Sequence, residues 1–249
     1  QIRRYKNSLN MYSDEIKSSE LAKKLLVFDL VYLDTCSLME DSFPLFICSM
    51  DGGNANASIA ASAEAVVAFM PEYEEEFCKI IDKERECLKS RFADTDSEIR
   101  LHAVPTDAMP HYLNNAREIL GCINMLPCGV IEMRSDMEGV VMTSNNIGIL
   151  HTGGTDISLS CHTRSFDDEE MHKVGEGIAR LFSEAGADET RLIMDTGAWM
   201  ERDDSPLLKI TCDTFRDVLG FEPKKVAMHF VLEAAYYVKK YPSTEIASI

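Results

Sequence analysis

The sequence predicts a mixed fold in which antiparallel strands alternate with amphipathic helices. The stretch from Gly139 to Arg164 has the pattern of a β-hairpin, because the glycine pair at 153–154 supplies the positive φ of a tight turn. A second turn signal, Asp51-Gly52-Gly53-Asn54, separates two strand-like runs. Between such runs, apolar residues recur with a period of 3.6, which is typical of amphipathic helices.

The second strand of the hairpin alternates between apolar and polar residues. Alternation places the two sets on opposite faces, so one face is expected to be buried while the other presents an arginine. The expected buried set is Ile157, Leu159, Cys161 and Thr163, and the opposite set is Ser158, Ser160, His162 and Arg164.

The N-terminal half is expected to hold strands and helices in alternation. Pro71 suits the first position of a helix, where its missing N–H has no partner to lose. The expected elements, in order, are a helix over 10–27, a strand over 28–33, a polar loop over 34–42, strands over 43–50 and 62–70, a helix from Pro71, and a strand over 97–103.

The second half carries clear helix boundaries. Asp167 and Ser165 are candidate N-caps, and Gly186 and Gly220 are natural C-terminal stops. The expected elements are helices from Thr106 to Cys122, from Asp167 to Gly186, over 206–219 and over 231–239, with strands over 191–194, 225–230 and 246–249. Because the chain starts with Gln1 and stops inside the last of these strands, we expect it to be a fragment.

The composition limits the partners of the chain. A formal net charge of -17 over 249 residues argues against nucleic acid as a partner, since phosphate binding needs a basic stripe, and it also argues against an anionic membrane surface. No apolar run reaches the length of a membrane span. The eight cysteines lack metal-ligand spacing and read as thiols of a reducing compartment.

The hairpin region also carries a family resemblance. A Leu-Pro-x-Gly-Val-Ile turn over 126–131, a Gly-x-Val-x-Thr-Ser-x-Asn-x-Gly run over 139–148, and Arg164-Ser165 together resemble aminoacyl-histidine (Xaa-His) dipeptidases, of the carnosinase-like family of two-metal peptidases. Further matches are the Gly-Gly-Asn turn at 52–54, the His-x-x-Leu-Glu segment from His229, and Tyr241-Pro242. Val231 and Ala235 replace two glycines of the family pattern.

The resemblance implies the fold class and the domains. It implies an α+β lid domain, in which helices pack on an antiparallel sheet, followed by part of an α/β catalytic domain. The expected boundaries are 1–195 for the lid, N-terminally incomplete and responsible for dimerisation, and 196–249 for the truncated piece of the catalytic domain.

The resemblance also assigns roles to four residues. Arg164 matches the lid arginine that grips the carboxylate of the substrate, which suits the fork geometry of guanidinium. His229 and Glu233 would lie near the substrate, and Asn56 stands one position from a substrate-binding asparagine of the family. Each residue also has a purely structural alternative. Arg164 would be a surface arginine at a strand end, and His229 a histidine at a strand end. Glu233 would be a glutamate at a helix N-terminus, and Asn56 a residue that stabilises the turn.

The implied activity is metal-dependent hydrolysis of Xaa-His dipeptides in the cytoplasm by a homodimer. Two divalent metals, zinc in the first instance, would serve the intact enzyme, but no metal ligand and no catalytic residue is assignable in this sequence. The chain alone is expected to be inactive. Two alternatives stay open: a degenerate lid that acts as a dimerisation or binding module, and a related amidohydrolase with another substrate.

Overall fold

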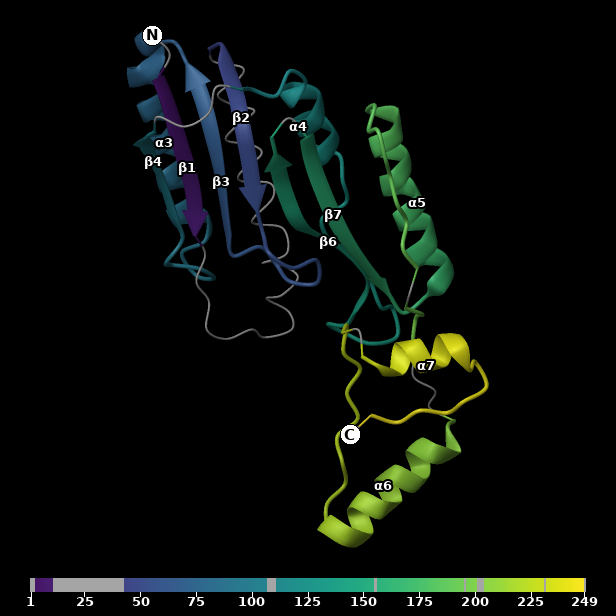
Figure 1. Ribbon diagram of the computed structural model, residues 1–249. Coiled ribbons are helices and arrows are strands. Elements are labelled where there is room, and N and C mark those ends of the chain that lie inside the picture. The colour runs from purple at the N-terminus through teal and green to yellow at the C-terminus, as the bar shows by residue number, and fades with distance from the viewer. Residues whose placement is uncertain are drawn as a thin grey trace.

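A computed structural model describes residues 3–10, 43–106, 111–154, 156–194, 196–200, 204–230 and 232–248, with the backbone alone over 3–10. The expected strand over 28–33 and all but the first residue of the helix over 10–27 lie outside the described residues. Within the described residues, an antiparallel sheet is combined with helices, which confirms the expected α+β class (Figure 1). None of the described helices combines the length and apolar composition needed to cross a bilayer.

In the part of the chain that the structure describes, seven strands form one sheet in which every pairing is antiparallel. The order is β4-β1-β3-β2-β6-β5, and β7 pairs with β6. The strands are β1 (Arg3–Asn10), β2 (Leu45–Gly52), β3 (Ser62–Phe69), β4 (Arg100–Pro105), β5 (Gly129–Met133), β6 (Val141–Gly153) and β7 (Asp156–Ser165). The predicted hairpin is therefore present as β6 and β7, with β5 as a further strand where a turn was expected.

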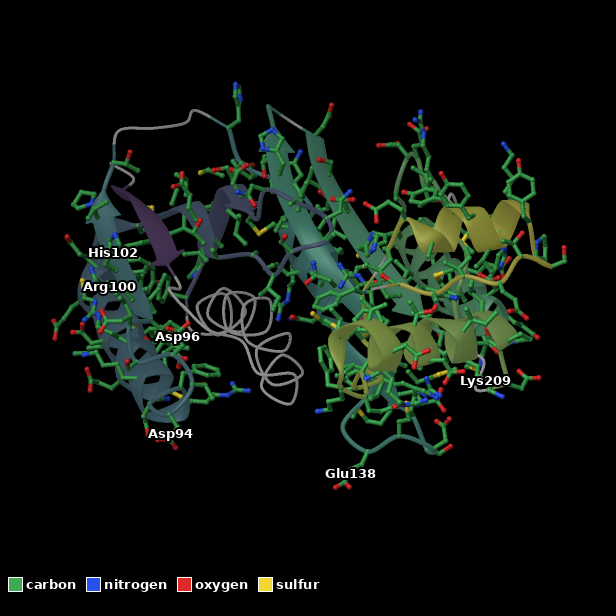
Figure 2. The ribbon with its side chains drawn as sticks, turned by 90° about the horizontal axis from the view of Figure 1, so that it is seen from below. Asp94, Asp96, Arg100, His102, Glu138 and Lys209 are labelled. Atoms are coloured by element: carbon green, nitrogen blue, oxygen red, sulfur yellow. The ribbon has the colours of Figure 1, made fainter. Side chains whose placement is uncertain are left out.

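The helices fall into two groups. α3 (Glu74–Arg91), α4 (Ala116–Asn124) and α5 (Asp168–Glu184) accompany the sheet, whereas α6 (Pro206–Leu219) and α7 (Ala234–Lys240) lie beyond its lower end in Figure 1. The view from below shows Arg100 and His102 on β4 at one end of the molecule and Lys209 of α6 at the other (Figure 2).

One apolar core joins the sheet to the first group of helices. Phe69 of β3 and Phe77 of α3 are both fully buried, with ring centroids 4.6 Å apart. Leu120 of α4 and Ile178 of α5 belong to the same cluster. The predicted inward residues Ile157, Leu159 and Cys161 pack against it, so the face of β7 was predicted correctly.

The predicted boundaries of α5 and α6 are confirmed. The Asp167 carboxylate accepts a hydrogen bond from the Glu170 N–H at 2.9 Å, and the Ser205 hydroxyl accepts one from the Leu208 N–H at 3.2 Å. Gly220 ends α6 with a left-handed φ of 75°, a conformation that an L side chain adopts at a cost.

Three predicted strands are wrong. Residues 191–194, 225–230 and 246–248 have no regular structure. Leu192 instead lies against Gly175 of α5, where an added Cβ would come within 2.7 Å of it. The segment over 225–230 keeps the alternation of a strand, since Val226, Met228 and Phe230 are exposed while Ala227 and His229 are partly buried, but no strand of the described sheet pairs with it.

The helix predicted from Thr106 begins only at Ala116. The residues before it, from 111 to 115, run beside β2, where the Leu113 N–H donates to the Ile47 carbonyl at 2.8 Å. That bond satisfies the Ile47 carbonyl of β2 and keeps the backbone of Leu113 out of a helix. A tertiary contact of this kind overrides local helix propensity.

A close backbone approach joins the turn after β2 to the middle of β6. An added Cβ at Gly53 would stand 1.9 Å from the Gly148 carbonyl oxygen, and one at Gly148 would stand 2.4 Å from the Asn56 Cα. Gly53 also has a φ of 69°. Both glycines are therefore required for residues 54–58 to lie on β6. We call these residues the 54–58 loop.

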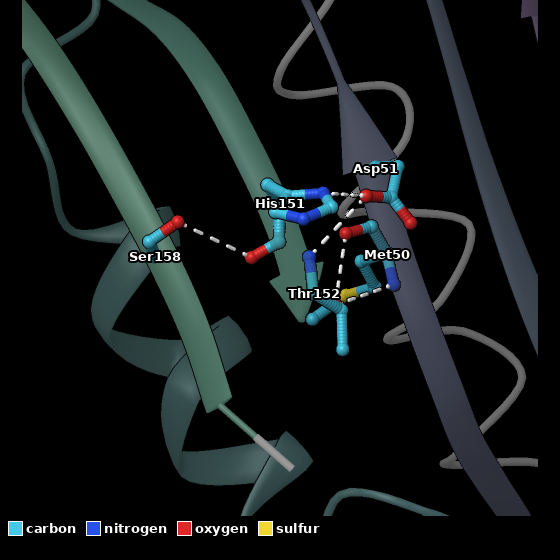
Figure 3. A network of polar contacts seen from close by, with 5 residues as sticks. All are labelled: Met50, Asp51, His151, Thr152 and Ser158. Carbon is cyan, nitrogen blue, oxygen red and sulfur yellow. Dashed lines mark hydrogen bonds and ion pairs between the residues drawn. The ribbon is translucent and has the colours of Figure 1, made fainter. Parts of the chain in front are cut away.

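Side chains reinforce this junction, because β2 and β6 share a single paired register at Gly52 and Leu150. The Thr152 hydroxyl donates to the Met50 carbonyl and accepts from the Met50 N–H, both at 2.9 Å. Asp51 accepts from the Thr152 N–H at 3.3 Å and contacts His151 Nδ1 at 2.5 Å (Figure 3). The network thus continues the sheet by side-chain contacts where the backbone ladder stops.

Gly53→Ala should destabilise the fold far more than Gly154→Ala. Both positions have a φ of 69°, which costs an alanine about 1–2 kcal/mol, but nothing lies within 4 Å of an added Cβ at Gly154. At Gly53 the clash with a backbone carbonyl should bring the total to about 3 kcal/mol or more. Urea unfolding of both variants measures the difference, and equal losses of stability would contradict the backbone approach.

Candidate functional site

The candidate site lies where β6, β7 and the 54–58 loop meet the segment that joins α6 to α7. Ser144 of β6 and Arg164 of β7 are directly paired residues in the antiparallel ladder. Paired residues point to the same face of a sheet, so their side chains lie side by side. This is the face opposite the apolar one of β7, as the alternation of that strand requires.

Arg164 is held against the 54–58 loop. Its Nη2 donates to the Ala57 carbonyl oxygen at 2.8 Å. Its Nε is buried and has no hydrogen-bond partner among the described residues. Burial lowers the pKa of the guanidinium, although an arginine stays charged at neutral pH. An unsatisfied buried donor is costly, and the positive charge of the guanidinium favours an anion beside the accessible part of the group.

Asn56 contributes its backbone rather than its amide. The Asn146 side chain donates to the Asn56 and Ser58 carbonyl oxygens, both at 2.9 Å, and is itself nearly buried. The Asn56 side chain is exposed. Asn146 thus ties the loop to the sheet at the carbonyls of Asn56 and Ser58. Arg164 bonds the Ala57 carbonyl that lies between them.

His229 reaches the same face from the C-terminal part of the chain. A hydrogen bond of 2.7 Å joins its Nε2 to the Ser144 hydroxyl, and its ring lies 5.9 Å from that of Phe166. Burial lowers the pKa of His229 to about 4, and the charge of Arg164 adds to this, while a hydrogen bond with the Val141 backbone opposes it. The ring is therefore neutral at pH 7.

Phe166 is supported from behind by a buried arginine. The Arg134 guanidinium lies over the Phe166 ring, 5.1 Å from its centroid. Asp136 accepts two hydrogen bonds from Arg134, at 2.9 Å from Nε and 2.6 Å from Nη2, and the guanidinium lowers the pKa of that carboxyl. Such a bidentate pair fixes the plane of the guanidinium and with it the ring that contacts His229.

The structure brings together three of the four predicted site residues. Arg164, His229 and the backbone at Asn56 share one face, but Glu233 is exposed just before α7, and no described hydrogen bond or ion pair joins it to Arg164 or His229. Sequence reasoning gave no role to Ser144 or Asn146, although both stand in the quoted Thr-Ser-x-Asn run. Nothing in the sequence pointed to Phe166 or Arg134.

The described residues do not form a metal centre. Within them, no group of three or more histidine, cysteine, aspartate or glutamate side chains is placed to hold a metal ion. The arrangement instead combines a partly buried arginine, Arg164, with the His229 imidazole and a loop that the sheet fixes.

The fold is of the α+β class, and the chain is similar in sequence and in fold to dipeptidases. The chain is similar to the cytosol non-specific dipeptidase of Escherichia coli strain K12, with 23% identity over 211 residues. It superposes on the crystal structure of aminoacylhistidine dipeptidase from Vibrio alginolyticus with a TM-score of 0.77 at 19% identity. Both matches confirm the resemblance to dipeptidases that the sequence indicated. No family model matches the chain.

The chain spans about half the length of these relatives. The first match covers 84% of this chain and 43% of the E. coli protein. The second covers 97% of this chain and 54% of the Vibrio protein.

The buried neutral state of His229 should make stability depend on pH. An unfolded histidine binds a proton near pH 6.5, whereas the folded one does so near pH 4. The unfolded state therefore binds more protons between these values, and His229 contributes stability that is lost as pH falls from about 6.5 to about 4, by at most roughly 1.4 kcal/mol per pH unit.

The contribution of His229 to the free energy of unfolding can be measured from the urea midpoints of the wild type and of His229→Gln between pH 7 and 4.5. The difference between the two proteins should change with pH across that window. His172→Gln, which alters an exposed histidine of α5, is the matched control. A constant difference between wild type and His229→Gln would mean that His229 does not titrate as the structure indicates.

Proposed function

We propose that the chain is the lid and a piece of the catalytic domain of a metal-dependent dipeptidase that hydrolyses Xaa-His dipeptides. The observation that carries the proposal is Arg164, a guanidinium on the face where His229 and the 54–58 loop converge, whose Nε has no hydrogen-bond partner among the described residues. The similarity to two dipeptidases, one of them named for aminoacyl-histidine substrates, supports the same reading.

Arg164 binds the C-terminal carboxylate of the dipeptide. A contact between the carboxylate and the accessible part of the guanidinium orients the substrate as well as neutralising its charge. The bond from Nη2 to Ala57 prevents the guanidinium from swinging away. Asn56 is exposed on the same loop, and we propose that its side chain contacts the peptide.

The intact enzyme uses two divalent metals, zinc in the first instance, which would polarise the peptide carbonyl and activate a water. The described residues offer no ligand set for them, and we propose that the ligands lie elsewhere in the enzyme. We further propose a cytoplasmic enzyme, as the name of the E. coli relative suggests, and a homodimer that forms through the lid.

The surface of the C-terminal part supports a longer protein. Ile210 and Val218 on α6 are 62% and 73% exposed, and Tyr236 and Tyr237 on α7 are at least half exposed. Large apolar side chains that are exposed on two helices are consistent with a surface that another structure covers. In the proposed enzyme that structure is the remainder of the catalytic domain.

The alternative is a lid without catalysis that serves as a dimerisation or binding module. The loss of two family glycines favours it, and Ala235, at one of these positions, is now buried. The intact mass of the protein in its source separates the two readings, since this chain weighs 27.9 kDa. A heavier protein supports the enzyme, and a matching mass supports the module.

The purified 249-residue chain should show no dipeptidase turnover when Zn²⁺ is added, because the described residues do not build a metal centre. Hydrolysis of an Xaa-His dipeptide, followed by release of free histidine, measures this. Robust turnover by this chain alone would overturn the proposed division of the enzyme.

In the active enzyme, Arg164→Gln should raise KM for Xaa-His dipeptides by about 10- to 100-fold, because a charge-assisted hydrogen bond to the carboxylate is lost. The KM of Arg164→Lys should lie between those of the wild type and Arg164→Gln, since lysine keeps the positive charge but lacks the planar guanidinium. Arg100→Gln, on β4 at the far end of the molecule, is the matched control (Figure 2). Equal KM values for the Arg164 and Arg100 variants would refute the role of Arg164.

A further inference from the structure

The 54–58 loop is held beside Arg164 by its backbone and not by its side chains. All of its residues are exposed, and none carries a large apolar side chain that could anchor it in the core. A hydrogen bond of 3.3 Å from the Ser58 N–H to the Ala55 carbonyl oxygen closes a turn, in which Asn56 and Ala57 are the central residues. Such a loop keeps one conformation only where its backbone groups find partners in the rest of the structure.

Asn146 of β6 provides two of these partners. Its Nδ2 lies 2.9 Å from the Asn56 carbonyl oxygen and 2.9 Å from the Ser58 carbonyl oxygen. A carbonyl oxygen only accepts hydrogen bonds, so the two contacts themselves place the amide nitrogen, with its two protons, on the side of the loop. Asn146 is 9% exposed, which leaves its amide little contact with water. Both protons of the amide are therefore used to hold the loop.

Arg164 of β7 provides the third partner. The Ala57 carbonyl, between the two that Asn146 binds, accepts from Arg164 Nη2 at 2.8 Å. Arg164 pairs with Ser144 across β6 and β7, so Asn146, two residues along β6 from Ser144, is its diagonal neighbour on the same face. Three consecutive carbonyls of the loop are thus held by two side chains that stand beside each other on the sheet.

The two side chains differ in how firmly the sheet holds them. Asn146 has a short side chain on a buried stretch of β6, whereas Arg164 has a long one that keeps a single orientation only if its far end is fixed. In the described structure, the hydrogen bond that fixes the guanidinium is the one to Ala57. Asn146 therefore sets the position of the loop, and the loop sets the orientation of the guanidinium.

We propose that Asn146 is a positioning residue of the site: it fixes the 54–58 loop, so that the Ala57 carbonyl holds one edge of the Arg164 guanidinium and leaves the accessible part of the group for the substrate carboxylate. This inference rests on the proposed function, in which Arg164 binds that carboxylate. Asn146 acts on the substrate through the loop and Arg164, and not by contact.

In the active enzyme, Asn146→Ala should raise KM for an Xaa-His dipeptide about three- to tenfold and leave kcat nearly unchanged, because hydrogen bonds that orient a binding group are lost. The matched control is Thr163→Val. It removes a hydrogen bond of 2.9 Å to the buried amide of Asn145, on the opposite face of the same two strands, and should leave KM unchanged. An unchanged KM in Asn146→Ala, a loss confined to kcat, or equal changes in the two variants would overturn the proposal.

A double-mutant cycle measures whether the effect passes through Arg164. In the Arg164→Gln background, Asn146→Ala should raise KM by less than about twofold, because the group that Asn146 positions is already absent. Full additivity of the two changes would mean that Asn146 acts on the substrate by another route, and the positioning role would be refuted. Asn146→Ser, a smaller change that keeps a polar side chain, serves the same cycle where Asn146→Ala does not fold.

The effect on Arg164 can also be followed without substrate, by NMR of the ligand-free chain. The signal of the Arg164 Nε–H is identified by its loss in Arg164→Lys. Because Nε is buried, its proton should exchange slowly with water in the wild type and about five- to tenfold faster in Asn146→Ala. The amide proton of Val67, in the middle of the sheet, should keep its rate. An Nε–H exchange rate that is the same in both proteins would contradict the proposal.

The role of Asn146 and the proposed function fail separately. If Asn146→Ala speeds the exchange of the Arg164 Nε–H but Arg164→Gln leaves KM unchanged, the proposed function fails and the positioning of Arg164 by Asn146 stands. If Arg164→Gln raises KM but Asn146→Ala changes neither KM nor the exchange rate, the role of Asn146 fails and the proposed function stands.

Discussion

The contact between Gly53 and Gly148 is the constraint on which the candidate site depends. The turn after β2 can approach β6 only because neither residue has a side chain, and the 54–58 loop is carried onto the sheet by that approach. Once there, the loop presents its carbonyls to Asn146 and Arg164. The arginine would otherwise lie at an open strand end, with nothing to fix its guanidinium.

The polar residues 143–146 of β6 fix the register in which β6 pairs with its neighbours. Residues 143–146 are all buried, and polar groups in that position are costly unless each finds a partner. Thr143 bonds Ser165, and Asn145 bonds both Pro127 and Thr163. Ser144 and Asn146, on the alternate face, bond His229 and the loop. A shift of one residue would exchange these sets and leave the site without its anchors.

The same stretch links the site to the C-terminal segment. His229 contacts Ser144 and Phe166, and the Phe166 ring lies against the pair formed by Arg134 and Asp136. Earlier in the chain, the Ala198 N–H donates to the Asp168 carboxylate of α5 at 2.7 Å. The C-terminal segment is therefore attached to the sheet by polar contacts at defined points.

The sequence by itself determined the local elements whose signals are contained within a few residues. The hairpin of β6 and β7, the inward face of β7, the cap at Asp167 and the end of α6 at Gly220 all follow from periodicity, capping chemistry and glycine conformation. The family resemblance also singled out Arg164 and His229 before their positions were known.

Tertiary structure decided the features that depend on partners far along the chain. The segment over 225–230 has the alternation of a strand but no partner strand in the described sheet, and Leu113 is held out of a helix by its bond to Ile47. Phe166, Arg134 and Ser144 became part of the site only through contacts across the fold. Local pattern fixes backbone preference and which face is apolar, whereas hydrogen-bond partners and close approaches between distant segments arise only when the chain has folded.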